Sequence, residues 1–148
     1  MVISTSYTEG NGWQKQRKKQ ANWTSPLVVK GSEGGELAAL QSGTGVDVVK
    51  PVTGEVVWRY GQGASTIPSS AVGADGVLYI PSNGLTAVKP GADQSAEVLW
   101  QSGSMRPGTA SPLVLGDRLY VINNSGVLNC VNTKDGERKW RIRLKGAY

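Results

Sequence analysis

The stretch that decides the fold class of this chain is VLNCVNTKDGERKWRIRL, residues 127–144. It holds two runs of alternating apolar side chains, joined through Asp135-Gly136. An Asp-Gly pair supplies the positive φ that a tight hairpin needs, and alternation is typical of a strand with one packed face. In the second run Trp140 and Ile142 point to one face and the charged residues to the other. The stretch therefore predicts a β-hairpin.

Two further strands precede this hairpin, and the resulting unit of four strands occurs three times. Turn pairs rich in Gly, Asn and Asp separate the strands, and no helical periodicity interrupts them. Four short strands in about 42 residues are typical of a four-stranded antiparallel β-propeller blade. The predicted strands are Ser25–Val29, Glu36–Ser42, Val46–Lys50, Val56–Tyr60, Ser69–Val72, Val77–Ser82, Leu85–Lys89, Glu97–Gln101, Ser111–Leu115, Arg118–Asn123, Val127–Asn132 and Arg138–Leu144.

Tryptophan marks the repeat along the chain. Trp58 and Trp100 are 42 residues apart, and Trp100 and Trp140 are 40 apart. Trp13 stands 45 residues before Trp58, which is about one period earlier. This spacing predicts that part of a further blade precedes the first complete one, with strands at Val2–Tyr7 and Gly12–Gln16.

Proline gives a second landmark near the start of each unit. Pro26 and Pro68 are 42 residues apart, and Pro68 and Pro112 are 44 apart. We expect Pro26 and Pro112 to set the entry to the innermost strands, which line the central channel. Serines repeat beside these prolines, and we interpret them as structural: Ser25, Ser69, Ser70 and Ser111.

The repeat predicts an all-β partial propeller of about three to three and a half blades. Each blade buries its faces against its neighbours, so the two end faces stay open within one chain. Either the chain is a fragment of a longer propeller, or copies associate and cover these faces as a homo-oligomer. The predicted division is 1–21 for outer strands of a partial blade with a basic linker, then blades at 22–62, 63–104 and 105–148.

The units resemble the repeats of the quinoprotein alcohol dehydrogenase-like propellers, also called PQQ-like repeats. Those repeats carry the pattern Ala-x-Asp-x-x-Thr-Gly-x-x-x-Trp, which residues 48–58 and 130–140 follow in spacing. The second unit, 87–100, has a longer turn before its tryptophan. The aspartate of the pattern is replaced in all three units, so its hydrogen bond is absent or altered. The replacing residues are Lys50, Lys89 and Asn132.

The resemblance implies roles for the repeated residues. It implies that Trp58, Trp100 and Trp140 dock between adjacent blades, and that Gly54 and Gly136 hold the turns before the outer strands. Relatives of this kind are often exported bacterial proteins, which implies a periplasmic or exterior location. The chain itself shows no signal-peptide pattern and no apolar stretch long enough for a membrane helix.

Enzymes with this repeat bind the quinone PQQ together with calcium or a lanthanide, and many carry adjacent cysteines above it. This chain has no histidine, one cysteine (Cys130) and acidic residues scattered through turns such as Glu33, Asp75 and Asp117. Without histidine, neither a Ser-His-acid triad nor an activated thiol can form. We therefore expect no catalytic, cofactor-binding or metal-binding residue, and a buried Cys130. The leading hypothesis is a non-catalytic scaffold that binds a protein partner or itself. The alternative is a fragment of a PQQ-dependent oxidoreductase whose site lies on other blades.

The net charge of +5 includes one basic run, residues 15–19. Such a run attracts nucleic acid or anionic lipid, and it supports a third hypothesis, a cell-surface or nucleic-acid-associated module. No aromatic stacking platform or known nucleic-acid module accompanies it. We interpret the run as a solvated loop or outer strand and do not expect nucleic acid as a partner.

Overall fold

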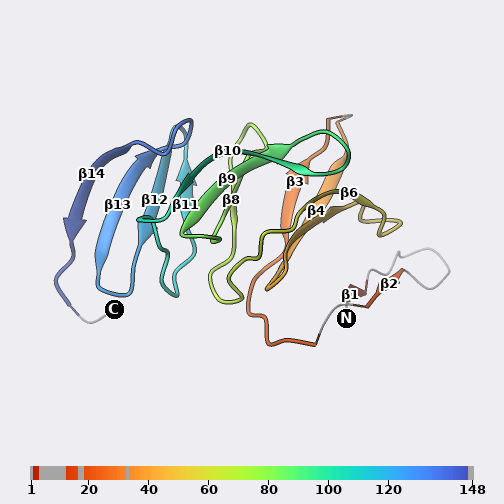
Figure 1. Ribbon diagram of the computed structural model, residues 1–148, viewed down its shortest axis with the longest axis horizontal. Helices are drawn as coiled ribbons and strands as arrows, with labels where there is room; N and C mark the ends of the chain where they lie inside the picture. The colour runs from red at the N-terminus through yellow and green to blue at the C-terminus, as the bar shows by residue number, and fades with distance from the viewer. Residues whose placement is uncertain (1, 4–12, 17–18, 33, 147–148) are drawn as a thin grey trace.

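The computed structural model describes residues 2–3, 13–16, 19–32 and 34–146. All regular secondary structure within these ranges is β-strand, arranged as three four-stranded antiparallel sheets and one two-stranded sheet. The predicted all-β fold with its four-stranded units is therefore confirmed. Each four-stranded sheet is called a blade below (Figure 1).

The strands of the three blades follow one another in chain order. The first blade consists of β3 (Leu27–Lys30), β4 (Glu36–Ser42), β5 (Gly45–Val49) and β6 (Val56–Tyr60). The second consists of β7 (Ala71–Val72), β8 (Leu78–Ile80), β9 (Leu85–Pro90) and β10 (Ala96–Ser102). The third consists of β11 (Leu113–Leu115), β12 (Arg118–Ile122), β13 (Val127–Asn132) and β14 (Arg138–Arg143).

A short two-stranded sheet lies beside the first blade. It pairs β1 (Val2–Ile3) with β2 (Gln14–Lys15) in antiparallel register. The strands predicted at Val2–Tyr7 and Gly12–Gln16 fall partly outside the described residues. Within them, the paired strands lie where the tryptophan period predicted part of a further blade.

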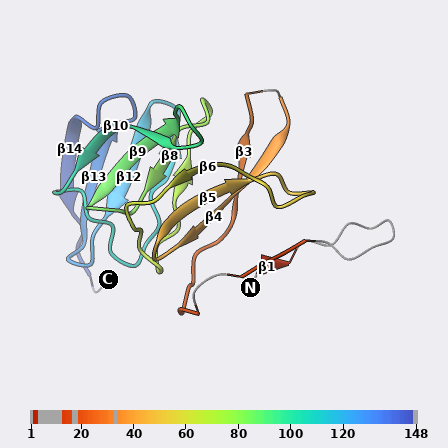
Figure 2. The same cartoon turned by 45° about the vertical axis from the view of Figure 1, so that its right-hand side comes forward.

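The blades stand in a row, each with its first strand on the inside. The innermost strands β3, β7 and β11 contact one another in turn, and the outer strands β6 and β10 of the first two blades are also in contact (Figures 1 and 2). The third blade and the β1–β2 pair lie at opposite ends of the row. A chain folded in this way has two different end faces.

Two apolar cores hold the row together, one between each pair of neighbouring blades. The first includes Val29, Val48 and Trp58 of the first blade and Leu78 and Val88 of the second. The second core joins the second and third blades, and its buried members are Val77, Tyr79, Leu85, Ala87, Met105, Leu119, Val121 and Val131. Most of the fully buried side chains therefore lie at contacts between blades, as a repeat architecture requires.

The three prolines do not mark the same position in the three blades. Pro26 and Pro112 directly precede the first residues of the innermost strands β3 and β11. Pro68, by contrast, lies three residues before the first residue of β7. The position equivalent to Pro26 is Ser70. The even proline spacing misled because Pro68 belongs to the loop that crosses from the first blade, where its carbonyl accepts a hydrogen bond from the Gln41 amide at 3.0 Å.

Candidate docking site between the blades

Each blade carries a row of three side chains, one from each of its last three strands. The row lies on the face that, in the first and second blades, packs against the blade that follows in the chain. The strand registers place these residues directly opposite one another. The outer strand always supplies the tryptophan and the middle strand a small or medium-sized residue. The three rows are Ala39–Val48–Trp58, Tyr79–Ala87–Trp100 and Tyr120–Cys130–Trp140.

The middle residue is small because aromatic rings close over it. In the second blade the rings of Tyr79 and Trp100 have centroids 5.9 Å apart, and in the third those of Tyr120 and Trp140 are 6.0 Å apart. Strands separated by one intervening strand lie about 9.5 Å apart, so the two rings must lean towards each other. The Cys130 thiol consequently lies beneath such a pair. It is free and only 1% exposed, as the sequence predicted.

Trp100 docks on the turn of the third blade. Its indole Nε1 donates to the Thr133 carbonyl at 2.9 Å, and the Tyr79 hydroxyl donates to the same oxygen at 3.3 Å. The ring lies so close to Gly136 that an added Cβ would sit 2.8 Å from Trp100 Cε3. Gly136 also has a positive φ of 71°. Both the close approach and the backbone conformation require glycine here.

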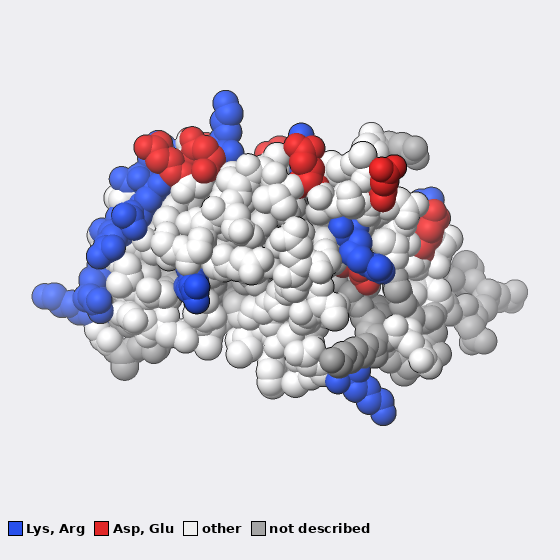
Figure 3. All heavy atoms as spheres, viewed as in Figure 1, with Lys and Arg blue, Asp and Glu red and all other residues white. Residues whose placement is uncertain are grey.

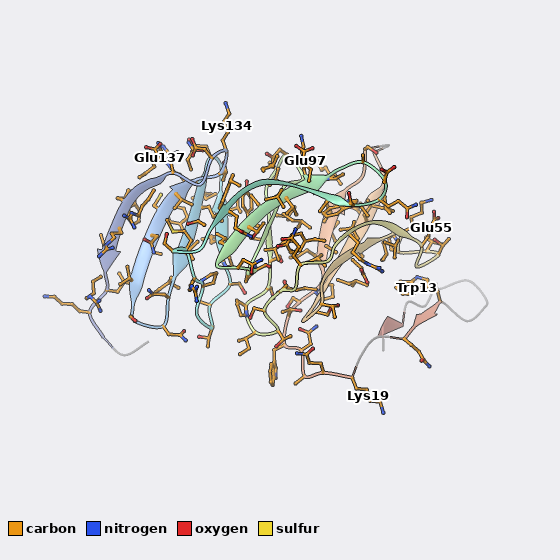
Figure 4. All side chains as sticks on the ribbon, viewed as in Figure 1. Trp13, Lys19, Glu55, Glu97, Lys134 and Glu137 are labelled. Atoms are coloured by element: carbon orange, nitrogen blue, oxygen red, sulfur yellow. The ribbon has the colours of Figure 1, made fainter. Side chains whose placement is uncertain are left out.

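Trp13 makes the same contact with the first blade. Its Nε1 donates to the Pro51 carbonyl at 2.7 Å, and a Cβ added to Gly54 would overlap the indole ring. Gly54 has a φ of 71°, equal to that of Gly136. In both cases the acceptor carbonyl stands three residues before the glycine. Figure 4 shows Trp13 beside the turn that carries Glu55.

The two turns that receive these tryptophans have the same backbone. In 50–55 and in 132–137 the glycine amide donates to the carbonyl four residues earlier, at 2.9 Å for Gly54 and 3.0 Å for Gly136. The replaced aspartate of the repeat pattern is compensated in the third blade, where Asn132 Oδ1 accepts from the Lys134 amide at 2.8 Å. The first blade is altered instead, because Lys50 pairs with Glu55 at 2.8 Å.

The junction of the first and second blades uses different chemistry. Trp58 is only 2% exposed, within the first apolar core. The longer turn of the second blade holds Asp93 and Gln94 at positive φ and brings the Gln94 carbonyl to the Arg59 amide at 2.8 Å. A backbone hydrogen bond therefore joins these outer edges. Two consecutive non-glycine residues at positive φ are unusual, and sequence patterns gave no sign of them.

A chain of serine hydrogen bonds connects the inner ends of the blades. The Ser25 amide donates to Ser69 Oγ at 2.8 Å, and the Ser69 amide donates to Ser111 Oγ at 2.9 Å. Each serine stands two residues before the first strand of its blade. The sequence showed the repeated serines but not this link, because the spacing of residues along a chain does not reveal which hydroxyl meets which amide.

Gln41 joins the first two blades from a buried position. Its amide nitrogen donates to the carbonyls of Ser65 and Pro68, at 2.6 and 3.0 Å. Its oxygen accepts from the amide and the hydroxyl of Ser70, at 2.7 and 2.8 Å. All four hydrogen-bonding positions of the side chain are thus used. No buried side-chain polar atom within the described ranges lacks a partner.

The row of the third blade is open. Trp140 is 42% exposed, and Ile142, Leu113 and Leu115 on the same blade are also exposed. Since Trp140 has no turn against it in the described chain, its position contrasts with the docked role that the repeat pattern implies. Its contact is with Tyr120 of its own blade.

Strand β14 carries four cations and no acidic residue. The exposed residues Arg138, Lys139, Arg141 and Arg143 lie on this strand, and Figure 3 shows them gathered along the outer edge of the third blade. Cations on an edge strand discourage pairing with another edge. Of the basic run at residues 15–19, Arg17 and Lys18 lie outside the described residues, so this run cannot be placed as a surface.

Tyr79 has a clearly shifted ionisation. Burial raises the pKa of Tyr79, the nearby negative charge of Asp75 raises it further, and the hydrogen bond with Thr133 opposes both. The phenol therefore stays neutral at ordinary pH and keeps the proton that it donates across the blade junction.

The acidic residues in the described part of the chain do not converge on a binding site. Asp75 and Asp135 accept hydrogen bonds from backbone amides of their own turns, and Asp117 forms an ion pair with Arg118, while Glu33 lies outside the described residues. No group of three or more His, Cys, Asp or Glu side chains occurs in the ranges that the structure describes. A quinone with a hard cation needs several converging oxygen ligands, so these donors do not fit that group.

The sequence profile of the family described as "Outer membrane protein assembly factor BamB" matches residues 42–147. A search among curated proteins found no sequence match. The described residues contain no helix that is long and apolar enough to cross a membrane.

Two solved structures show the fold. BamB from Moraxella catarrhalis superposes with a TM-score of 0.60 at 19% identity, over 75% of this chain and 35% of its own. The quinohemoprotein alcohol dehydrogenase from Comamonas testosteroni superposes with a TM-score of 0.61 at 17% identity, over 84% of this chain and 21% of its own. The predicted PQQ-like propeller repeats are thus confirmed, and the chain spans about a third or less of either protein.

Proposed function

The chain belongs to the family of the outer membrane protein assembly factor BamB, and we propose that it is a non-catalytic propeller module that works through protein contacts. Its partner is a protein of the exported assembly machinery or a second copy of the chain. The proposal places the module in the bacterial envelope, as the family name suggests.

The use of the reactive side chains carries this proposal. Acidic groups hold their own turns or pair with neighbouring cations, as Asp117 does with Arg118. Aromatic and amide side chains serve the contacts between blades, as Trp100 and Gln41 do. Side chains used in this way stabilise the blades, and the exposed apolar side chains of the third blade offer a surface for a protein contact.

The rival function is part of a PQQ-dependent oxidoreductase. The similarity to the Comamonas testosteroni enzyme favours it only at the level of the fold, since identity is 17%. Folds shared at this level host different functions. The rival also requires ligand residues from blades that are not part of these three.

A titration with PQQ and calcium separates the two functions. We expect no saturable binding by calorimetry and no reduction of an electron-accepting dye when alcohols or sugars are added. Saturable, calcium-dependent binding of PQQ would overturn the non-catalytic proposal and support the oxidoreductase.

The absolute mass in solution, measured by light scattering on a sizing column, tests the protein-contact part. We expect a mass that rises with concentration towards a multiple of 15.7 kDa. One monodisperse species near 15.7 kDa at every concentration would exclude a second copy as the partner.

A further inference from the structure

We propose that three arginines on β14 bind an extended acidic segment of another protein. Arg138, Arg141 and Arg143 lie opposite alternate residues of β13, so their side chains share one face of the sheet. These three residues are called the arginine row below. The inference rests on the proposed function, because it gives the chemistry of a partner for the protein contacts.

The arginine row lies on the face of the third blade that packs against the second blade. Arg138 is opposite Val131, and Val131 belongs to the core that the second and third blades share. Trp140 and Ile142 alternate with the arginines along β14 and point to the other face. The row is therefore separate from the exposed apolar side chains of the third blade.

The positions of the row remain accessible in the two blades that another blade follows. Counted from the tryptophan of each blade, the equivalent residues are Val56, Arg59 and Gly61 in the first blade and Val98, Gln101 and Gly103 in the second. The first set lines an open pocket together with residues 93–95 of the second blade. In the second set Val98 is 40% exposed although the third blade is present. Accessibility is thus a property of these positions in every blade.

Only the third blade has a cation at all three positions. The first blade has valine, arginine and glycine there, and the second has valine, glutamine and glycine. The three blades share their strand order and their tryptophan, so the blade architecture does not require the arginines. Like charges on neighbouring side chains of a sheet also repel one another. The row is therefore better explained by an anionic ligand than by the fold.

The central arginine lacks the counter-charge that the first blade supplies. Arg59 pairs with Asp47, its cross-strand neighbour, at 2.5 Å. In the second blade Gln101 donates a hydrogen bond to its neighbour on β9 at 2.9 Å. Arg141 instead lies opposite the neutral Asn129, and its guanidinium has no ion pair or hydrogen bond within the described part of the chain. Its charge is available to a ligand.

The other two arginines keep their charge as well. Arg138 has no ion pair among the described residues, and Arg143 Nη1 donates to the uncharged Ser125 carbonyl at 3.0 Å. Lys139 differs, because it pairs with Glu137. The uncompensated charge of β14 therefore consists of guanidinium groups, whose planar arrangement of donors suits bidentate binding of a carboxylate.

The spacing of the row fits an acidic peptide in an extended conformation. Residues two apart on a strand are about 7 Å apart on the same face, so the guanidinium groups start from positions at intervals of about that length. An extended peptide with Glu or Asp at alternate positions presents carboxylates at the same interval. No strand in the described ranges of this chain carries two acidic residues, so the matching segment belongs to another protein.

Other polyanions match the row less well. A bilayer presents anionic head groups over a plane, whereas the arginines form a single line with the acidic Glu137 beside it (Figure 4). Single-stranded nucleic acid is bound through bases stacked on aromatic rings, and the arginine row contains no aromatic residue. An acidic peptide needs only the charges and the spacing that the row supplies.

Fluorescence anisotropy with a labelled peptide of four Glu-Thr repeats tests the row. The native chain is compared with the double variant Arg138→Gln and Arg141→Gln, since neither side chain has an internal bond to lose within the described residues. The control is the double variant Lys30→Gln and Lys134→Gln, which removes the same charge from exposed positions outside the row. We expect the dissociation constant to rise about tenfold or more for the arginine variant and less than about threefold for the control. Circular dichroism verifies that both variants are folded.

Two comparisons test the geometry of the row rather than its charge. Replacing Arg138 and Arg141 by lysine keeps the charge but removes the planar donors, so we expect a smaller loss of affinity than for glutamine. A peptide of the same composition, with its glutamates in one block followed by its threonines, should bind more weakly than the alternating peptide. Equal binding of the two peptides would overturn the match to an extended acidic segment.

An equal loss of affinity in the lysine control would also overturn the inference, because net charge alone would then explain binding. Tighter binding of a single-stranded thymidine oligonucleotide, or of phosphatidylcholine vesicles containing phosphatidylglycerol, would overturn the choice of a peptide. Absence of peptide binding by the native chain would remove this partner and leave the proposed protein-contact function standing. Calcium-dependent PQQ binding would instead contradict the proposed function itself.

Discussion

The second and third blades carry the same row of side chains in two different settings. In the second blade the pair Tyr79 and Trp100 is covered by a neighbour and donates two hydrogen bonds to one carbonyl. In the third the pair Tyr120 and Trp140 has the same ring separation without a neighbour. The separation of the two rings is therefore set by their own sheet, whereas their interplanar angle differs, at 39° in the second blade and 55° in the third. Docking then adds the buried area and the hydrogen bond.

The two settings should differ most in how much the tryptophan contributes to the free energy of unfolding. Trp100→Ala should lower the free energy of unfolding by about 3 kcal/mol, since it removes a docked ring and its hydrogen bond. Trp140→Ala should cost about 1 kcal/mol, because 42% of the side chain is already exposed and no partner is left unsatisfied. Urea unfolding of dilute protein measures both. Equal costs would mean that the neighbouring turn adds nothing to the second-blade pair.

Glycine substitutions test how much the turn contributes to docking of the tryptophan. Gly136→Ala should cost about 2–3 kcal/mol, because alanine strains at positive φ and its Cβ displaces the Trp100 ring. Gly116→Ala is the matched control, since Gly116 has a φ of 59° and nothing within 4 Å of its missing Cβ. Backbone strain alone should make it cost about 1 kcal/mol. A similar cost at both positions would show that the close approach of the ring is unimportant.

Much of this comparison was predictable from the sequence, for a physical reason. Tryptophan, glycine and alternating strands are local signals, so the blades, the buried Cys130 and the importance of the 40–45-residue tryptophan spacing could be predicted. The exposed state of Trp140 was not predicted, because the repeat pattern implied that it docks between blades. Such local signals predict individual strands and turns but not the contacts between residues that are far apart in the sequence.

The contacts between blades were not predictable in the same way. The serine chain, the Gln41 staple and the backbone bond of Arg59 depend on three-dimensional proximity, which sequence spacing does not report. The spacing of Pro68 was misleading for the same reason, because a crossing loop of changed length shifted it out of register. Trp13 could have been assigned to Gly54 from the repeat pattern, since Trp100 docks on Gly136, and each of these glycines stands four residues before the next tryptophan of the repeat.

Thiol reactivity tests whether the open pair really lacks a neighbour. Cys130 lies under the rings of Tyr120 and Trp140 of its own blade, whereas Ala87 in the second blade lies under its rings and in the core shared with the third blade. In a Cys130→Ala background, the thiol of an Ala87→Cys variant should react with a disulfide reagent at least about tenfold more slowly than Cys130 does in the native chain. Trp140→Ala should in turn accelerate labelling of Cys130.

Equal labelling rates for Cys130 and for the thiol introduced at 87 would contradict the open third-blade face. They would show that something covers the third blade as completely as the third covers the second. Repeating the experiment at high protein concentration connects it to association, because docking of a second copy should protect Cys130 and leave the slow thiol at 87 unchanged.

The smallest expected effect concerns pH and the docked phenol. The pKa of Tyr79 is raised above its ordinary value of 10.0 by burial and by Asp75, against the hydrogen bond with Thr133. Above pH 10 the unfolded chain therefore loses this proton before the folded chain does, so the unfolded state binds fewer protons and stability falls as pH rises. Below pH 10 both states hold the proton, and the contribution is fully present.

Tyr79→Phe isolates this contribution from the other groups that titrate at alkaline pH. The variant loses the hydroxyl that donates to the Thr133 carbonyl, so we expect it to be less stable than the native chain at pH 8 by about 1 kcal/mol. Between pH 10 and 11 the gap should narrow, because only the native chain loses stability through this phenol. A gap for Tyr79→Phe that widens with pH would mean that the ionised phenol is better accommodated in the folded chain, and that the second-blade junction is wetter than its burial indicates.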